Sequence, residues 1–134
     1  MLSITGSYFF TTQHYTAAID EFKKSLAAGY DNSGLQLSWG QAILQTLDPK
    51  DSPDEGKRKK DEAIGHFRKS VALDPNNAVA HLWLGQSLVL SRVEGDNEGN
   101  AKLKDEACGE YKKVLRLQPN NTDAKKGMER IGCK

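Results

Sequence analysis

Cysteine is scarce in this sequence of 134 residues, which contains only Cys108 and Cys133. Two cysteines are too few and too separated along the chain for the disulfide framework of a small secreted domain. We therefore expect both to be reduced thiols in a reducing compartment. The first ten residues also lack the basic start of a signal peptide. These absences predict a cytoplasmic protein, with the nucleus as the alternative.

Long hydrophobic runs and an excess of one charge are also missing. No apolar run approaches the roughly 20 residues of a membrane-spanning helix, so we expect no membrane partner. The 19 Lys and Arg residues nearly balance the 18 Asp and Glu residues, and the net charge of +1 provides no general attraction to nucleic acid or acidic lipid. Hydrophobic residues make up 37% and charged residues 28% of the chain, a composition typical of one folded domain over residues 1–134.

Catalytic and metal-binding motifs are absent from the sequence. The histidines, His14, His66 and His81, do not lie at metal-ligand spacing from one another or from the cysteines. The chain has no glycine-rich phosphate loop, no nucleophile elbow and no His-Glu-x-x-His motif. We expect His66 at the surface or boundary of a helix, and Cys108 as a small apolar helix residue. The sequence therefore predicts no enzyme activity, no cofactor and no metal ion.

The most informative feature that is present is an internal repeat. Leu73-Asp74-Pro75-Asn76-Asn77 returns 44 residues later as Leu117-Gln118-Pro119-Asn120-Asn121. Similarity at a period of about 20 to 50 residues is typical of a stack of like structural units. Two further segments recur upstream in the same order. Asp61-Glu62-Ala63 corresponds to Asp105-Glu106-Ala107, and Trp39-Gly40-Gln41 corresponds to Leu84-Gly85-Gln86.

The repeated units are predicted to be helical throughout. Apolar residues recur at three- and four-residue steps, and no segment shows the strict alternation of a strand. Pro75 and Pro119 mark helix ends, because proline has no N–H and disfavours helix in the residue before it. Thr122 is expected to be the N-cap of a last helix. The earlier helices are predicted over 15–28 and 35–47 and around the pairs Ala63 and Phe67, Leu84 and Leu88, and Ala107 and Tyr111.

This pattern resembles the tetratricopeptide repeat (TPR) family, in which each unit is a pair of antiparallel helices, A and B. In that family helix A carries a large, a small and another large residue. Helix B carries an alanine, an aromatic, a small residue and a closing proline. The matching positions are Trp39, Gly40, Ile43, Ala63, Phe67, Ser70 and Pro75 in the second unit, and Leu84, Gly85, Leu88, Ala107, Tyr111, Val114 and Pro119 in the third.

The resemblance implies an all-α fold, an α-solenoid of antiparallel helix pairs wound as a right-handed superhelix. The units would span about 1–32, 33–77 and 78–121, with a C-terminal capping helix at about 122–132. Glycine and alanine let the paired helices approach closely, and the aromatic residues fill the space between units. A single unit cannot bury its apolar face alone, so the units are stable only when they are stacked on one another. The first unit matches less completely, with a helix A beginning almost at Met1, and its matching residues are Gly6, Phe9, Ala18, Phe22 and Ser25.

The second and third units depart from the family by insertions of about ten residues between the two helices. Ser52-Pro53-Asp54-Glu55 has the form of a capping box with proline at the first helical position. We therefore predict that helix B of the second unit starts near Pro53, and that of the third near Asn97, with Asp96 as its cap. The turns would lie at 48–52 and 94–96. The alternative is a disordered charged loop, which is compatible with the glycines at 56, 95 and 99.

The resemblance also implies a concave groove, lined by the A helices, that binds an extended or helical peptide. Trp83 is the strongest candidate, because exposed tryptophan is a frequent hot-spot residue. The alternative is that Trp83 packs against a neighbouring helix. The family's clamp for a C-terminal carboxylate is missing, since Ser3, Ser7, Ser38, Val79 and Trp83 occupy its positions. The predicted groove residues are Phe10, Leu37, Gln41, Leu44, Gln45, Val79, Leu82, Trp83, Gln86, Val89 and Leu90.

The expected function is a non-catalytic scaffold that binds a peptide or helix of a partner protein. One alternative is a homodimeric assembly module that pairs through apolar residues near Ile4, Phe9 and Phe10. A weaker alternative is a nucleic-acid-associated protein that uses a basic stretch. That stretch is more often a solvated helix face, and it consists of Lys57, Arg58, Lys59 and Lys60.

Overall fold

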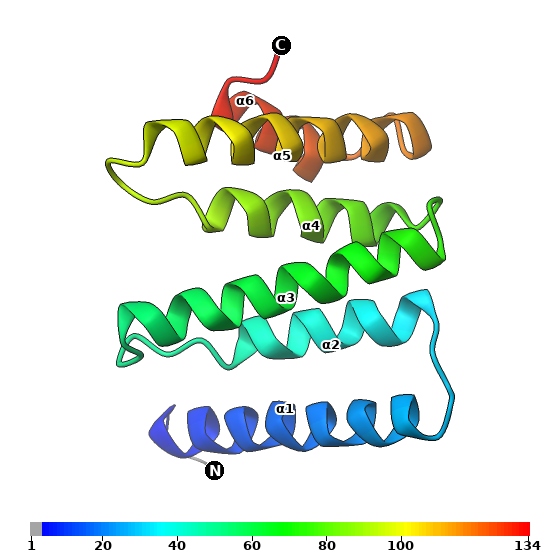
Figure 1. The fold of residues 1–134 in the computed structure, drawn as a ribbon, viewed down its shortest axis with the longest axis vertical. Coiled ribbons are helices and arrows are strands. Elements are labelled where there is room, and N and C mark those ends of the chain that lie inside the picture. Colours follow the sequence, from blue (N-terminus) through cyan, green and yellow to red (C-terminus); the bar gives the residue numbers. More distant parts are fainter. Residues whose placement is uncertain (1–3) are drawn as a thin grey trace.

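The computed structural model describes the backbone of residues 4–134 and the side chains from residue 14 onward. Within this range the chain forms six helices and no strand, which confirms the all-α prediction (Figure 1). The helices are α1 (Ile4–Ala27), α2 (Ser33–Gln45), α3 (Pro53–Leu73), α4 (Ala78–Leu90), α5 (Asn97–Leu117) and α6 (Thr122–Ile131).

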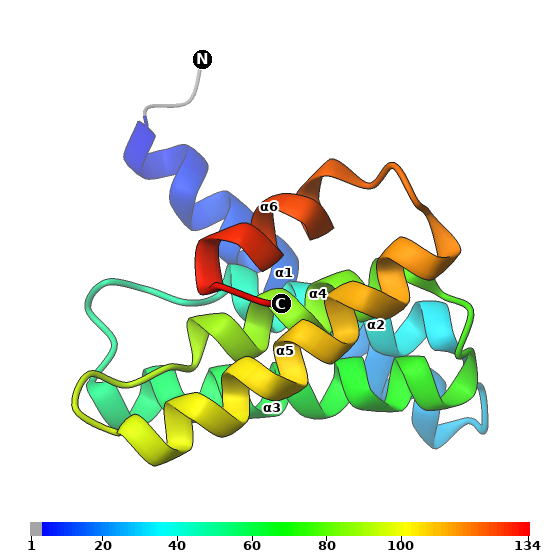
Figure 2. The same cartoon turned by 90° about the horizontal axis from the view of Figure 1, so that it is seen from above.

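The helices are stacked in chain order, each one against the next (Figure 1). The most extensive contacts join α2 to α3 and α4 to α5, which are the two pairs connected by the insertions. In addition, α4 contacts both α2 and α6. These three helices therefore line one side of the stack, while α3 and α5 lie toward its other edge (Figure 2). The handedness of the stack and the capping role of α6 remain predictions.

The first unit is the clearest departure from the sequence prediction. A helix pair was expected within residues 1–32, but the structure has one continuous helix, α1, from Ile4 to Ala27. The physical reason lies in the segment itself. It contains no proline, and Gly6, near its start, is its only glycine, so no residue in the middle ends the helix or forms a turn.

The two insertions lengthen α3 and α5, as predicted, so the disordered-loop alternative is wrong. Helix α3 starts at Pro53, and the Ser52 hydroxyl accepts a hydrogen bond from the Glu55 N–H at 3.1 Å. Helix α5 starts at Asn97, and the Asp96 carboxylate accepts from the Gly99 N–H at 3.0 Å. Each cap satisfies a backbone donor that the first helical turn leaves without a partner.

The helices on the other side of the stack, α2, α4 and α6, all begin at an asparagine. The side chains of Asn32, Asn77 and Asn121 accept from backbone N–H groups three residues further on, at 2.8, 3.1 and 2.9 Å. The N-cap of α6 is therefore Asn121 and not Thr122, which is its first helical residue. Asparagine is the stronger cap of the two, and the repeated Pro-Asn-Asn segment thus ends one helix and starts the next.

The core confirms the expected close approach of paired helices. A Cβ atom added at Gly40 would lie 2.5 Å from the ring of Phe67, and one added at Gly85 would lie 3.0 Å from the ring of Tyr111. Phe67 is fully buried and Tyr111 nearly so. Each aromatic ring of helix B therefore occupies the space that a side chain on helix A would need.

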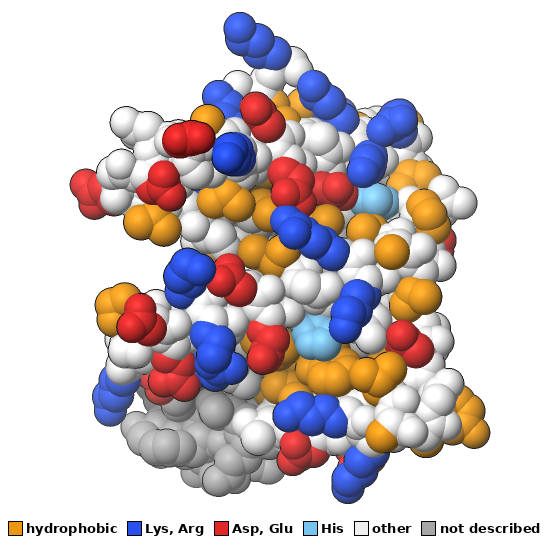
Figure 3. Space-filling model, in the orientation of Figure 1, with side chains coloured by type: hydrophobic (Ala, Val, Ile, Leu, Met, Phe, Trp, Pro, Cys, Tyr) orange, Lys and Arg blue, Asp and Glu red, His pale blue; other side chains and the backbone are white. Residues whose placement is uncertain are grey.

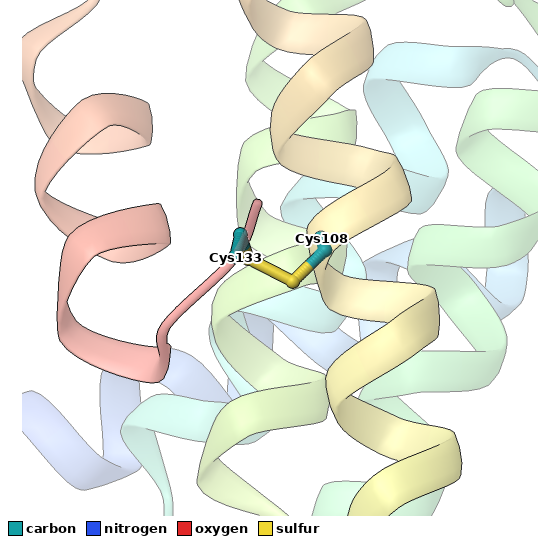
Figure 4. The surroundings of a disulfide bond; sticks show 2 residues. All are labelled: Cys108 and Cys133. Carbon is teal, nitrogen blue, oxygen red and sulfur yellow. A yellow bond between two sulfur atoms is a disulfide. The ribbon is translucent and has the colours of Figure 1, made fainter.

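The two cysteines form a disulfide, so the prediction of reduced thiols is wrong. Cys108 lies on α5, and Cys133 follows the end of α6, with 5.7 Å between their Cα atoms (Figure 4). Gly132 has a φ of 75°, a left-handed conformation that glycine adopts without strain. This residue turns the chain back toward α5 after α6. The two cysteines are far apart in the sequence, so the sequence did not indicate that they pair. The packing of α6 against α5 brings them together.

Candidate functional site

Helix α4 is apolar on two opposite faces. Its core face contains Ala80, Leu84 and Leu88, which are almost completely buried. On the opposite face, the side chains of Val79 and Leu90 are 45% and 49% exposed. A helix that is hydrophobic all round is normally buried on all sides, so the outer face of α4 has the character of a surface that contacts another molecule.

The exposed face of α4 forms a continuous line, which we call the α4 stripe. Its members are spaced by four, three and four residues, and this spacing places them on one side of a helix. Leu82 and Val89 lie beside the stripe and pack partly against the core. The α4 stripe consists of Val79, Trp83, Gln86 and Leu90.

Helix α2, which contacts α4 on the same side of the stack, presents a polar line at the corresponding positions. We call Gly34, Ser38, Gln41 and Gln45 the α2 stripe. None of its members carries a charge, and Gln41 is partly buried while the other three are exposed. The two stripes together form a surface that is half apolar and half amide-rich.

The remaining predicted groove residues differ in how far the structure describes them. Leu37 and Leu44 are half-buried beside the α2 stripe and pack against the core. Phe10, and the apolar residues near Ile4 and Phe9 that were proposed for self-association, have side chains outside the described part of the chain.

Trp83 combines the two roles that the sequence left as alternatives. Its indole ring lies 6.1 Å from the ring of Phe67 on α3, with 34° between the two planes. The side chain is therefore packed against a neighbouring helix. It is still partly exposed, so the ring both contacts α3 and keeps some surface open to solvent. A fixed aromatic ring loses little conformational entropy when it binds a partner.

The basic stretch from Lys57 to Lys60 is largely neutralised by ion pairs. Lys57 contacts Asp61 at 2.8 Å, and Arg58 lies 3.5 Å from Glu62. Lys59 turns toward the preceding loop, where it donates to Asp51 at 2.9 Å and to the Thr46 carbonyl at 2.8 Å. These contacts make the stretch a poor anion-binding surface.

The hydrogen bond from Lys59 to Asp51 also affects the pKa of the Asp51 carboxyl. The hydrogen bond from Lys59 lowers the pKa of the Asp51 carboxyl, and the bond from the Asp48 N–H acts in the same direction. The Asp51 charge is thereby favoured in the folded chain. Lys59 therefore helps to hold the start of the extended α3 helix against the loop that precedes it.

Two polar pairs, one partly buried and one buried, join helix A to helix B at the same place in successive units. In one, Gln36 on α2 meets His66 on α3, with 2.7 Å between Oε1 and Nδ1. In the other, His81 on α4 meets Glu110 on α5, with 2.5 Å between Nδ1 and Oε2. The sequence reading missed both pairs. Superposing the two units by their repeat would have placed Gln36 with His81 and His66 with Glu110.

In the third unit both ring nitrogens of the histidine have a partner. The His81 Nε2–H donates to the Pro75 carbonyl at 2.7 Å, because a carbonyl can only accept. The other ring nitrogen, Nδ1, faces the Glu110 carboxyl. His81 is 3% exposed, and this arrangement satisfies its ring without solvent.

His66 is expected to make the fold less stable in mild acid. Partial burial lowers the pKa of His66 below its ordinary value, the Lys69 charge adds to this effect, and Glu62 and Asp31 oppose it. The unfolded chain therefore binds the proton more tightly, so the contribution of His66 to stability is complete above a pH of about 6.5 and is lost as the pH falls below it. His66→Gln retains a donor for Gln36 and removes the titration.

Urea unfolding of both proteins at a series of pH values checks this expectation. The stability of the original chain should fall more steeply than that of His66→Gln as the pH decreases from about 7 to about 5. The His81–Glu110 pair is present in both proteins, so it contributes equally. Parallel pH profiles would contradict the assignment.

The described residues contain no group of three or more His, Cys, Asp or Glu side chains that could hold a metal ion. Among residues 4–134, no helix has the length and hydropathy needed to cross a membrane. Searches against models of known protein families and against curated protein sequences return no match for this chain.

Proposed function

We propose that this chain is a TPR-like scaffold that binds a helix or an extended peptide of a partner protein in the groove between α2 and α4, without catalysis. The observation that carries the proposal is the α4 stripe. Val79, Trp83 and Leu90 present apolar surface on a helix whose other face already forms the core. Apolar surface of this kind typically marks an interaction site.

The composition of the groove supports a partner of amphipathic or neutral character. Neither the α4 stripe nor the α2 stripe contains a charged residue, so the groove has no cation to pair with a carboxylate. The amides of Gln41, Gln45 and Gln86 can both donate and accept hydrogen bonds. An amphipathic helix would place its apolar side against α4 and its polar edge against α2.

Replacing Val79 and Leu90 together with glutamate tests the proposal. Both side chains are about half exposed, so the double variant should fold, while two charges in the groove should weaken partner binding by more than about 2 kcal/mol, as at other interface hot spots. The measurement is affinity capture from a native lysate, with circular dichroism to verify the helix content of each variant.

The matched control is Val93→Glu combined with Leu73→Glu. These residues are exposed to a similar extent, 53% and 51%, but lie outside both stripes. We expect the control to retain the partners of the original chain and the groove variant to lose them. Retention of the same partners by both variants would contradict the groove assignment.

The disulfide affects the proposed location of this function. Structural disulfides persist in oxidising compartments and are rare in the cytosol. We therefore propose that the chain functions in an oxidising environment in preference to the cytoplasm that the sequence predicted.

A further inference from the structure

A cleft lies where α3 ends, α4 begins and α5 ends, and no residue of either stripe lines it. Its volume is about 390 Å³, within the range of about 300 to 1,000 Å³ typical of ligand sites. Val71, Pro75 and Leu117 supply apolar surface inside it. Figure 3 shows hydrophobic side chains next to Lys and Arg side chains at this right-hand edge of the molecule. We call it the α3–α5 cleft.

The charge of the α3–α5 cleft is of one sign. Lys113 and Arg116 line it, and no carboxylate does. Two acids lie next to the lining residues. Glu110 is 7% exposed and is already engaged by His81 at 2.5 Å and by Lys113 at 3.2 Å, and the Asp74 carboxylate accepts from the Asn76 backbone N–H at 3.0 Å. Arg116 makes no hydrogen bond or ion pair with the described part of the chain. Its guanidinium group therefore stays available to an anionic partner.

A peptide suits the cleft better than a simple hydrocarbon anion. Asn76 also lines the cleft. Its backbone N–H donates to Asp74 at 3.0 Å, while its side-chain amide has no partner in the described chain. A free amide offers both a donor and an acceptor, which matches the two hydrogen-bonding groups of a peptide unit.

We propose that the α3–α5 cleft binds an acidic peptide segment that carries an apolar anchor residue. The apolar side chain lies against Val71, Pro75 and Leu117, and a flanking carboxylate pairs with Arg116. The guanidinium group is planar and its fork of N–H donors matches the two oxygens of a carboxylate. This site is separate from the groove between α2 and α4, so either proposal can fail without the other.

The probe is a labelled nine-residue peptide with a central leucine and glutamates on both sides, measured by fluorescence anisotropy. Arg116→Glu should weaken its binding at least tenfold, about 1.4 kcal/mol, since it removes a charge-assisted hydrogen bond and puts a carboxylate in its place. Arg92→Glu is the matched control, because Arg92 is exposed, has no ion pair and lies outside the cleft. It should bind the probe like the original chain.

Two altered probes and one further variant complete the experiment. Exchanging the leucine for serine, or the glutamates for lysines, should each weaken binding about as strongly as Arg116→Glu. Arg116→Gln removes the charge without reversing it, which preserves the test if the reversal disturbs the end of α5. The groove variant with glutamate at Val79 and Leu90 should bind the probe normally.

Several results would overturn the proposal. The first is a failure of the glutamate probe to show saturable binding at concentrations up to about 1 mM, the range of very weak affinity. The second is equal binding by Arg116→Glu and Arg92→Glu. The third is concentration-dependent dimerisation of the chain alone, detected by sedimentation and abolished by Arg116→Glu, because the occupant would then be a second copy of this chain.

Discussion

Reduction of the disulfide between Cys108 and Cys133 will lower the free energy of unfolding by about 3 kcal/mol. The bond closes a loop with a sequence separation of 25 residues, and loops of this size restrict the unfolded chain by about that amount in the chain-entropy description. Helix α6 has only ten residues, of which Ala124 and Ile131 are buried. A short end helix with little buried surface depends strongly on a covalent link to its neighbour.

Urea unfolding with and without a reductant measures this effect. The variant with serine at both Cys108 and Cys133 should match the reduced chain and should not respond to the reductant. Native-state hydrogen exchange of the reduced chain should show α6 opening before α3, α4 and α5, because helices at the end of a stack contact only one side of it. Equal stability of the oxidised and reduced chains would show that the disulfide has no stabilising role.

Phe67→Ala is expected to cost about 3 to 5 kcal/mol, the usual range for removing a buried aromatic ring. Phe67 is fully buried, its ring lies over Gly40, and it also supports Trp83 of the α4 stripe. The substitution therefore leaves a cavity between α2, α3 and α4. Chemical denaturation gives the loss of stability, and the groove should bind its partner more weakly as well.

A double-mutant cycle with Gly40→Ala tests the packing directly. In the original chain the new methyl group would lie 2.5 Å from the Phe67 ring, and such overpacking costs about 1 to 3 kcal/mol. In the Phe67→Ala background the space is empty, so the same change should stabilise by up to about 1 kcal/mol, the helix preference of alanine over glycine. The coupling between the two sites should therefore be large.

Gly65→Ala is the matched control for this cycle. Gly65 is inside α3, and a Cβ atom added there meets nothing within 4 Å. The change should stabilise by up to about 1 kcal/mol in both backgrounds. Additive effects of Gly40→Ala and Phe67→Ala would contradict the close approach of α2 and α3.

The sequence by itself determined the local structure of the second and third units. The prolines and asparagines of the repeat set the helix boundaries, since proline disfavours helix before it and asparagine caps the helix that follows. Ser52 and Asp96 predicted the extended starts of α3 and α5 correctly, because a cap acts only on the next few residues. The resemblance to the repeat family predicted that Gly40 and Gly85 allow a close approach of paired helices, and the structure added that the rings of Phe67 and Tyr111 fill the space above them.

Only the tertiary structure decided the features that depend on residues far apart in the chain. It joined Cys108 to Cys133, paired His81 with Glu110, and turned Lys59 away from solvent toward Asp51. It also assembled the α3–α5 cleft from the ends of α3 and α5 and the start of α4. The reason is physical: capping and periodicity act within one or two helical turns, whereas disulfides, buried ion pairs and clefts depend on how separate helices pack.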